Sequence, residues 1–153
     1  MQNYFSYKTP AGPITIASNG NAIIGVLIGV HHLSGENKPN QITNNAANQL
    51  QEYFAGKRRV FDLPLEPHGT TFQKQVWQAL QEIPYGETRS YREIAESIGN
   101  PKAYRAVGSA NNKNPIHIVI PCHRVIGSNG APIGYAAGVQ VKEFLLDLEQ
   151  QNL

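Results

Sequence analysis

Short apolar runs alternate with polar and turn-forming residues along the first thirty positions of the chain. Residues 4–8, 14–17 and 22–28 are rich in strand-forming residues, and segments rich in Pro, Gly and Asn separate them. The apolar period then lengthens to that of a helix, which we expect to end at Gly56. The residues on the apolar face of this helix are Ile42, Ala46, Leu50, Tyr53 and Phe54. The first part of the chain therefore predicts a small sheet of hairpins with one helix.

A cluster of helix-breaking residues follows this helix. Pro64, Pro67 and Gly69 fall close together, as is typical of a linker. We therefore place a domain boundary here, with one domain over residues 1–68 and a second over residues 69–153. The length agrees with this division, because 153 residues suffice for one ordinary globular domain or for two small ones.

The pattern beyond the boundary is mainly helical. Thr70 and Gln73 have the spacing of a capping box, and so do Ser90 and Glu93, which predicts a helix after each pair. The apolar stripe of the first helix consists of Phe72, Val76, Trp77, Leu80 and Ile83. The second helix is short, and we expect it to end at Gly99.

A third helix follows so closely that the pair has the pattern of a helix-turn-helix. Asn100 and Pro101 are the residue types of an N-cap and of a first helical position. On a helical projection Arg105 lies opposite the apolar face, so we expect its side chain to point outward, near Lys102 and Ser109. A plain helical corner with no role in nucleic-acid binding is an equally open interpretation.

Isoleucine residues alternate with other residues just before the only cysteine of the chain. Ile116, Ile118 and Ile120 have the period of a half-buried strand, which we expect to end at Pro121. A glycine-rich loop over residues 127–138 follows the cysteine. The last helical period has an apolar face formed by Val141, Phe144, Leu145 and Leu148. The cysteine therefore directly follows a predicted strand.

The composition is that of an ordinary globular protein, with 41% hydrophobic and 16% charged residues. One cysteine cannot form an internal disulfide and no Cys/His cluster has zinc-finger spacing, which excludes a disulfide scaffold and a structural metal module. The longest apolar stretch, residues 22–30, is far shorter than the roughly 20 residues of a membrane helix. Residues 1–8 lack the features of a signal peptide. We therefore expect a cytoplasmic protein with no membrane partner and no metal.

Positive charge is concentrated in the middle of the chain. The formal net charge is only +2, but residues 89–124 contain six Lys or Arg and two Asp or Glu, which gives this block a charge of +4. Both a solvated helix face and a surface that binds a polyanion explain such a block. Charge alone favours the solvated face.

Cys122 is the candidate nucleophile. A lone cysteine is more often a small buried hydrophobic residue, so its neighbours decide the interpretation. His123 and Arg124 follow it directly, and both favour the reactive thiolate. Adjacent side chains point apart in regular structure, so we expect His123 to act through a bridging water or a distorted backbone rather than by a direct hydrogen bond.

The segment around this cysteine resembles the O6-alkylguanine-DNA alkyltransferases. Residues 114–125 read NPIHIVIPCHRV, two helices precede them, and Gly134-Tyr135 and a closing helix follow. The similarity covers residues 72–149, and its PCHRV string is specific. The resemblance implies an α/β (α+β) fold. It comprises a small N-terminal antiparallel sheet with a helix, then a mostly helical C-terminal domain with a helix-turn-helix and the active-site cysteine.

The resemblance also implies a role for each residue of the candidate catalytic group. Cys122 takes an alkyl group from the O6 of guanine and keeps it, so each molecule acts once. His123 activates the thiol through a water, Glu149 orients the imidazole, and Asn114 ties the turn around the cysteine. We expect the sulfur to be exposed beside a cavity of nucleobase size.

The same resemblance implies contacts with DNA. A base inside a duplex hides its alkyl group, so the nucleotide must be flipped out. Arg105 matches the arginine that replaces the flipped base, and Tyr91 matches the tyrosine that crowds the phosphate and hydrogen-bonds the extruded guanine. The recognition helix of the family lies in the minor groove. The other residues for which we expect DNA contacts are Ser90, Lys102, Ala106, Ser109 and Arg124.

Four residues are implied to bind the extruded base: Tyr91, Val125 through its backbone carbonyl, Tyr135, and Ala136 through its backbone amide. One residue of this loop departs from the family pattern, because Ala137 stands where the family usually has a glycine.

The expected partner is double-stranded DNA that contains O6-alkylguanine, with the O4 of alkylated thymine as an open alternative. We expect a protein that needs no cofactor and no metal and acts as a monomer, and whether molecules bind DNA cooperatively stays open. Three other interpretations remain. They are an alkyltransferase-like sensor that binds damaged DNA without repairing it, a helix-turn-helix regulator with an inert thiol, and a cysteine hydrolase.

Overall fold

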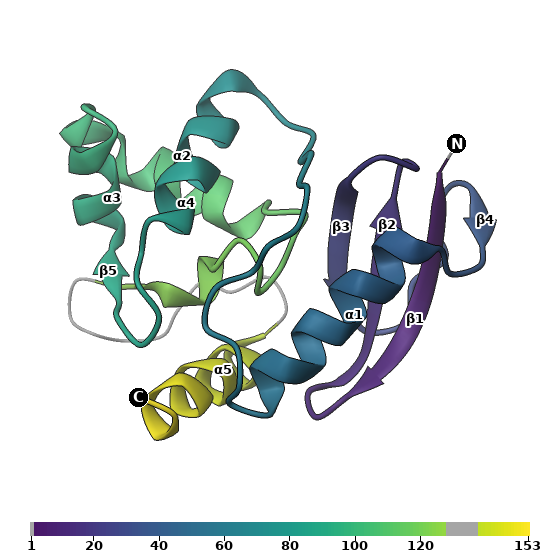
Figure 1. Cartoon of the computed structure of the whole chain (residues 1–153). Coiled ribbons are helices and arrows are strands. Elements are labelled where there is room, and N and C mark those ends of the chain that lie inside the picture. The colour runs from purple at the N-terminus through teal and green to yellow at the C-terminus, as the bar shows by residue number, and fades with distance from the viewer. Residues whose placement is uncertain (1, 128–137) are drawn as a thin grey trace. The chain divides into compact units, whose positions relative to one another are not determined.

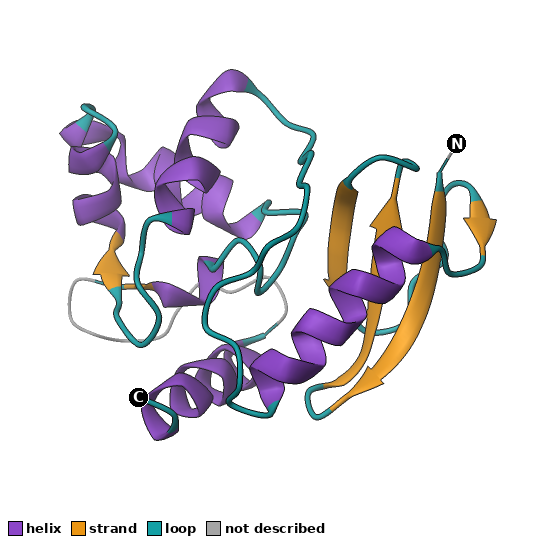
Figure 2. Ribbon diagram, viewed as in Figure 1, coloured by secondary structure: helices purple, strands orange, loops and turns teal. Residues whose placement is uncertain are grey.

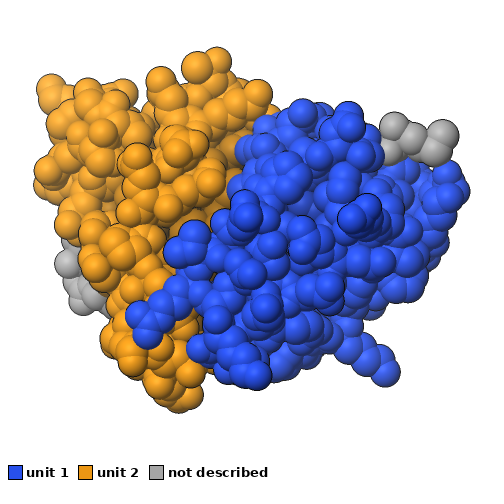
Figure 3. Space-filling model, viewed as in Figure 1, with its two compact units in different colours: residues 1–68, 115–117 blue, residues 69–114, 118–153 orange. Residues whose placement is uncertain are grey.

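The chain divides into two compact units. The computed structural model describes residues 2–127 and 138–153. One unit contains Met1–His68 and Pro115–His117, and the other contains Gly69–Asn114 and Ile118–Leu153 (Figures 1 and 3). The three residues of the 115–117 segment therefore pack with the first unit, although they precede the cysteine closely in sequence.

The first unit is built on a four-stranded sheet. Strands β1 (Asn3–Thr9), β2 (Gly12–Ser18) and β3 (Ile23–Ile28) form the two antiparallel hairpins that the sequence predicts. A two-residue strand, β4 (Glu36–Asn37), pairs in parallel with β1, so the sheet has the order β3-β2-β1-β4 and is mixed. Both residues of β4 are exposed, and such a short polar strand has no hydrophobic period that would predict it.

Helix α1 (Gln41–Phe54) packs against one face of this sheet (Figure 2). It begins with a capping box, in which Asn40 accepts from the backbone of Thr43 and Thr43 accepts from the backbone of Asn40. It ends just before Gly56, whose φ of 75° suits glycine. Apolar side chains that the helix and the sheet bury together include Ile14, Ile16, Ile23, Val26, Ala46, Leu50 and Tyr53. The predicted apolar face is therefore the one that the sheet covers.

The second unit consists mainly of helices. They are α2 (Thr71–Gln81), α3 (Tyr91–Ser97), α4 (Tyr104–Asn112) and α5 (Val139–Gln151). Thr70 and Ser90 make the two predicted capping boxes, with Gln73 and Glu93 respectively. No helix in the described part of the chain combines the length and the apolar character that crossing a bilayer requires.

The start of the third predicted helix differs in detail from expectation. Asn100 makes no side-chain cap, and Pro101 opens a 3-10 turn, η1 (Pro101–Ala103), which runs directly into α4. Proline tolerates this position because the first helical residues have no intrahelical acceptor for their N–H groups. Arg105 is exposed on α4, and Val107 and Ala110 are buried, as the helical projection predicts.

The predicted strand before the cysteine is wrong. Ile116 forms a single parallel bridge with Val26, and residues 117–119 are a turn in which Ile118 has a φ of 71°. A left-handed residue cannot continue an extended strand, and it is costly for a β-branched side chain. Ile116, Ile118 and Ile120 are nevertheless all buried, so both sides of the segment are covered and the alternation reflects no exposed face.

The apolar face predicted for the closing helix is correct only at Leu145. The buried residues of α5 are Lys142, Leu145 and Glu149, whereas Phe144 is 39% exposed. Residues three and four apart lie on one helical face, so these three form a single stripe. Polar residues occupy this stripe because they pair with groups around the cysteine.

Candidate active site

Cys122 begins a single 3-10 turn, η2 (Cys122–Arg124). Its amide donates to the carbonyl of Ile120 at 2.8 Å, and its carbonyl accepts from the amide of Val125. The side chain is buried, with 0% of its surface exposed. The expectation of an exposed sulfur is therefore wrong for the free protein, because the turn directs this residue inward.

His123 faces away from solvent and is held by a carboxylate of the last helix. Its Nε2 lies 2.6 Å from Oε2 of Glu149, and both side chains are fully buried. An ionised carboxylate only accepts hydrogen bonds, so Nε2 carries the proton. Burial lowers the pKa of His123 although the Glu149 contact opposes this change, so the imidazole is neutral near pH 7. Nδ1, which has no hydrogen-bond partner among the described residues, is then the basic atom of the ring.

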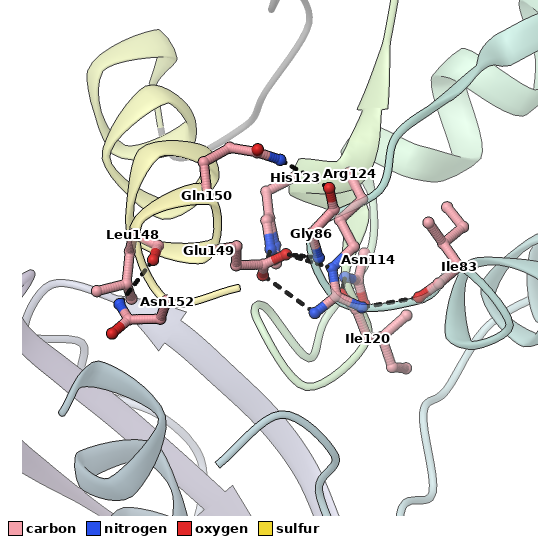
Figure 4. Close-up of polar contacts among 10 residues, drawn as sticks. All are labelled: Ile83, Gly86, Asn114, Ile120, His123, Arg124, Leu148, Glu149, Gln150 and Asn152. Carbon is pink, nitrogen blue, oxygen red and sulfur yellow. Dashed lines mark hydrogen bonds and ion pairs between the residues drawn. The ribbon is translucent and has the colours of Figure 1, made fainter. Parts of the chain in front are cut away.

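Glu149 is the centre of a buried polar network (Figure 4). Its Oε1 accepts from Nε of Arg124 at 2.8 Å and from the amide of Gly86 at 3.0 Å, and its Oε2 accepts from Nη2 of Arg124 at 3.0 Å. Burial alone would raise the pKa of this carboxyl, but His123 and Arg124 together hold it well below its ordinary value. Glu149 is therefore ionised and fixed in position.

The expected role of Arg124 in binding DNA is contradicted by this network. Its guanidinium is only 7% exposed, and its remaining terminal nitrogen, Nη1, donates to the carbonyl of Ile83 at 2.8 Å. All three nitrogens thus bind groups inside the protein, and the side chain is too deeply buried to reach a phosphate. Arg124 instead neutralises Glu149.

Two buried asparagines hold the turn that presents the cysteine. Nδ2 of Asn114 donates to the carbonyl of Ile120 at 2.8 Å, which closes the turn over residues 114–120. Nδ2 of Asn111, at the end of α4, lies 3.3 Å from the carbonyl of Cys122. The end of this helix is therefore tied directly to the backbone of the cysteine.

Two short strands pair in parallel and bring the start of α3 next to the turn that contains Cys122. Strand β5 (Arg89–Ser90) pairs with β6 (Val125–Ile126), which directly follows η2. Tyr91, the next residue along, is half-buried. Burial raises its pKa, and the negative charge of a Cys122 thiolate adds to this rise. The phenol is therefore a hydrogen-bond donor at neutral pH, close enough to the sulfur for the two groups to interact electrostatically.

Comparisons with known proteins agree along the whole chain. Residues 71–151 match the family model for the DNA-binding domain of 6-O-methylguanine DNA methyltransferase, and residues 3–67 match that for its ribonuclease-like domain. The chain belongs to the 6-O-methylguanine DNA methyltransferase family. It combines the ribonuclease-like N-terminal domain of this family with its DNA-binding domain.

Individual members of the methyltransferase family are similar over nearly their full lengths. The methylated-DNA–protein-cysteine methyltransferase of Methanosarcina barkeri is 55% identical, with 98% of each chain covered. The constitutive enzyme of Bacillus subtilis is 45% identical over 98% of this chain and 96% of its own. The crystal structure of Mycobacterium tuberculosis OGT in complex with DNA has a TM-score of 0.92 and 44% identity, and covers 98% of this chain and 94% of that one.

Within the DNA-binding domain of this methyltransferase, the residues expected to contact DNA share one exposed face. Lys102, Arg105, Ala106 and Ser109 are all exposed on η1 and α4. Arg92 of α3, which the sequence analysis does not single out, stacks with Arg105 on the ring of Tyr104, at 5.2 and 5.8 Å from its centroid. Ser90 is half-buried, and its hydroxyl accepts from the amide of Glu93 in the capping box.

The residues expected to bind the base are only partly described. Tyr135, Ala136 and the atypical Ala137 lie outside the described residues. Val125 is buried, and its carbonyl, which we expect to face the base, accepts a hydrogen bond from Nζ of Lys142. A base that binds to this carbonyl must therefore share its oxygen with Nζ of Lys142.

Three groups near the cysteine are not among the residues predicted from the sequence. They are the amide of Gly86, the side chain of Asn111 and the side chain of Lys142. Backbone groups carry no sequence signal, and a single Asn or Lys on an amphipathic helix is usually solvated. The position of Lys142 within the apolar stripe of α5, three residues before Leu145 and seven before Glu149, is a signal that could have revealed it.

Proposed function

We propose that this protein repairs alkylated DNA by moving an alkyl group from the O6 of guanine to the sulfur of Cys122. The observation that carries the proposal is the buried Cys122-His123-Glu149 arrangement on η2 and α5, in a chain that belongs to a family of DNA methyltransferases. A helix-turn-helix adjoins this arrangement, and Asn111 connects it to the cysteine. Like the family, this protein binds DNA, and the proposal narrows its ligand to duplex DNA with an O6-alkylated guanine.

The transfer step balances with the groups present. Nδ1 of His123 takes the thiol proton, through a water or after a small movement, and leaves a thiolate. The sulfur pair forms a bond to the alkyl carbon, and the C–O6 bond breaks with its electron pair remaining on the base. The base then takes up one proton and is released as guanine. Since no second nucleophile attacks the thioether, each molecule reacts once.

Tyr91 is the proposed donor to the base. Its raised pKa keeps the phenol protonated, so it can donate a hydrogen bond to the negative charge that develops on the departing guanine. Because Cys122 is fully buried, side chains around the sulfur must move aside when the base enters. The base therefore reaches the thiolate only when these side chains move, so base entry and access to the sulfur are coupled.

The exposed face of η1 and α4 supports a role in base flipping. Arg105 is long, charged and exposed there, and small side chains at Ala106 and Ser109 allow close approach of a groove. We propose that Arg105 occupies the stack in place of the extruded guanine, which offsets part of the few kcal/mol that extrusion costs.

Intact-mass spectrometry tests the proposed reaction. After incubation with a duplex that contains one O6-methylguanine, we expect the protein to gain the mass of one CH2 unit, located on Cys122 by peptide mapping. The oligonucleotide should then contain ordinary guanine. A damage sensor would bind this duplex without either change, and a cysteine hydrolase would turn over an ester or amide instead. An unmodified protein after prolonged incubation would refute the proposal.

Replacing Arg105 by alanine is expected to separate repair of duplex DNA from reaction with a free base. The rate with a methylated duplex should fall about ten- to a hundredfold, because each ~1.4 kcal/mol lost is a factor of ten. The rate with free O6-benzylguanine, which needs no flipping, should stay unchanged. Single-turnover assays measure the transfer rates with both substrates. Arg59→Ala, which removes an exposed arginine from the first unit, is the matched control. Equal losses with both substrates would argue against a flipping role.

A further inference from the structure

Two arginine side chains gather over one tyrosine ring on the surface of the second unit. Cζ of Arg92, from α3, is 5.2 Å from the ring centroid of Tyr104, the first residue of α4, and Cζ of Arg105 is 5.8 Å from it. Both arginines are exposed, and Tyr104 is half-buried. Each distance is within the range of a cation–π interaction. The ring therefore holds two cations close together, although like charges repel one another.

Neither arginine is neutralised by a carboxylate. The described part of the chain provides no ion pair for Arg92 or for Arg105, whereas it does for other arginines. Glu96 lies one turn after Arg92 on α3, at a spacing at which opposite charges commonly pair, and Arg92 nevertheless lies over a ring of the next helix. The positive charge of the two guanidinium groups is therefore left for an external anion.

The ring belongs to the side of α4 that packs against α3. Tyr104 and Gly108 are four residues apart, so they share one side of the helix. A methyl group at Gly108 would lie 3.8 Å from the ring of Tyr91, which places Tyr91 next to this side. Tyr91 and Arg92, consecutive residues of α3, thus lie against successive turns of α4. The two arginines are therefore held beside the tyrosine that is the proposed donor to the base.

We propose that Tyr104 is a positioning residue for DNA, which orders Arg92 and Arg105 before the duplex arrives, so that Arg92 binds a backbone phosphate. An arginine side chain loses rotamer entropy when it binds, and stacking on a ring beforehand removes part of that cost. Arg105 leaves the ring when it enters the base stack, and Arg92 stays on it with its phosphate. Binding of an undamaged duplex tests the positioning, and only the effect on repair rests on the proposed function.

The affinity for an undamaged duplex, measured by fluorescence anisotropy at several salt concentrations, is the first readout. Arg92→Gln should lower this affinity about three- to tenfold. It should also reduce the slope of log affinity against log salt concentration by about one, because one phosphate contact is lost. Lys74→Gln, which removes an exposed lysine of α2, should change neither quantity and is the control. An unchanged slope in Arg92→Gln would overturn the proposal.

Two substitutions of Tyr104 separate the ring from its bulk. Tyr104→Leu keeps an apolar side chain between the helices and removes the aromatic ring, so the affinity should fall about three- to tenfold. Tyr104→Phe keeps the ring and should bind the undamaged duplex like wild type. In the Arg92→Gln background, Tyr104→Leu should lower the affinity by no more than about twofold, because the ring has one guanidinium fewer to hold. Effects that multiply in full, or weak binding by Tyr104→Phe, would overturn the proposal.

Transfer kinetics with a methylated duplex supply the last readout. Tyr104→Leu should raise the duplex concentration that gives half of the maximal rate. The maximal rate itself should stay within about twofold of wild type, because Arg105 no longer contacts the ring once the base is extruded. A lower maximal rate with unchanged half-saturation would contradict the positioning role. If wild type transfers nothing, the proposed function fails while the binding measurements still decide the role of Tyr104.

Discussion

Cys122→Ser is expected to lose alkyl transfer completely while it retains binding to DNA. Its hydroxyl is far less acidic than a thiol, so His123 cannot generate a useful anion near pH 7. Removing a catalytic nucleophile typically lowers a rate by at least about a thousandfold. The rate of mass gain with an O6-methylguanine duplex measures this loss, and fluorescence anisotropy with the same duplex measures binding.

The effect of Cys122→Ser on stability must be separated from its effect on transfer. The sulfur is fully buried, so the new hydroxyl needs a hydrogen-bond partner, and Cys122→Ala provides a variant without that need. Both variants should bind the duplex about as tightly as wild type, because the exposed residues of α4 are unchanged. Transfer by either variant would show that the acceptor is another residue, and loss of binding by both would show that the turn itself has been disrupted.

Glu149→Gln is expected to produce the largest loss of stability among the site variants. It leaves the guanidinium of Arg124 buried without a counter-charge, and removing one partner of a buried ion pair costs about 3–5 kcal/mol. It also leaves His123 without the carboxylate that fixes its tautomer, so the transfer rate should fall about a hundredfold. Urea unfolding at pH 7 and single-turnover kinetics with O6-benzylguanine measure the two effects.

Two further variants separate the effects of Glu149. Glu143→Gln removes an exposed carboxylate of the same helix and should change neither the unfolding midpoint nor the rate. Arg124→Met combined with Glu149→Gln removes both buried charges, so most of the stability should return while the rate stays low. If the double variant is as unstable as Glu149→Gln, the unpaired charge is not the cause of the loss.

Much of the fold is predictable because its signals are local. A capping box needs only four consecutive residues, and Thr70 and Ser90 make theirs as expected. The segment before Cys122 shows where such signals fail. Alternating isoleucines predict a strand only if one side is exposed, and here the turn around Ile118 buries every one of them.

The candidate site is predictable in part. The Cys122-His123 pair is adjacent in sequence, and its contact with Glu149 follows from resemblance to a family rather than from any local pattern. The prediction that Arg124 contacts DNA shows where such reasoning fails. A basic residue in a basic block is expected at the surface, but its three bonds to Glu149 and Ile83 place it in the interior.

The amino-acid sequence alone determined the starts of α2 and α3, the hairpins, the outward position of Arg105 and the identity of the single thiol, since each depends on neighbours within a turn or two. Tertiary structure alone decided that Arg124 and Lys142 are buried cations, that Tyr91 interacts electrostatically with Cys122 and that the sulfur is covered. These features arise from contacts between segments far apart in the chain. Whether a charge is solvated or paired depends on which side chains those contacts bring to it. The hydrophobic periodicity of a single segment does not contain this information.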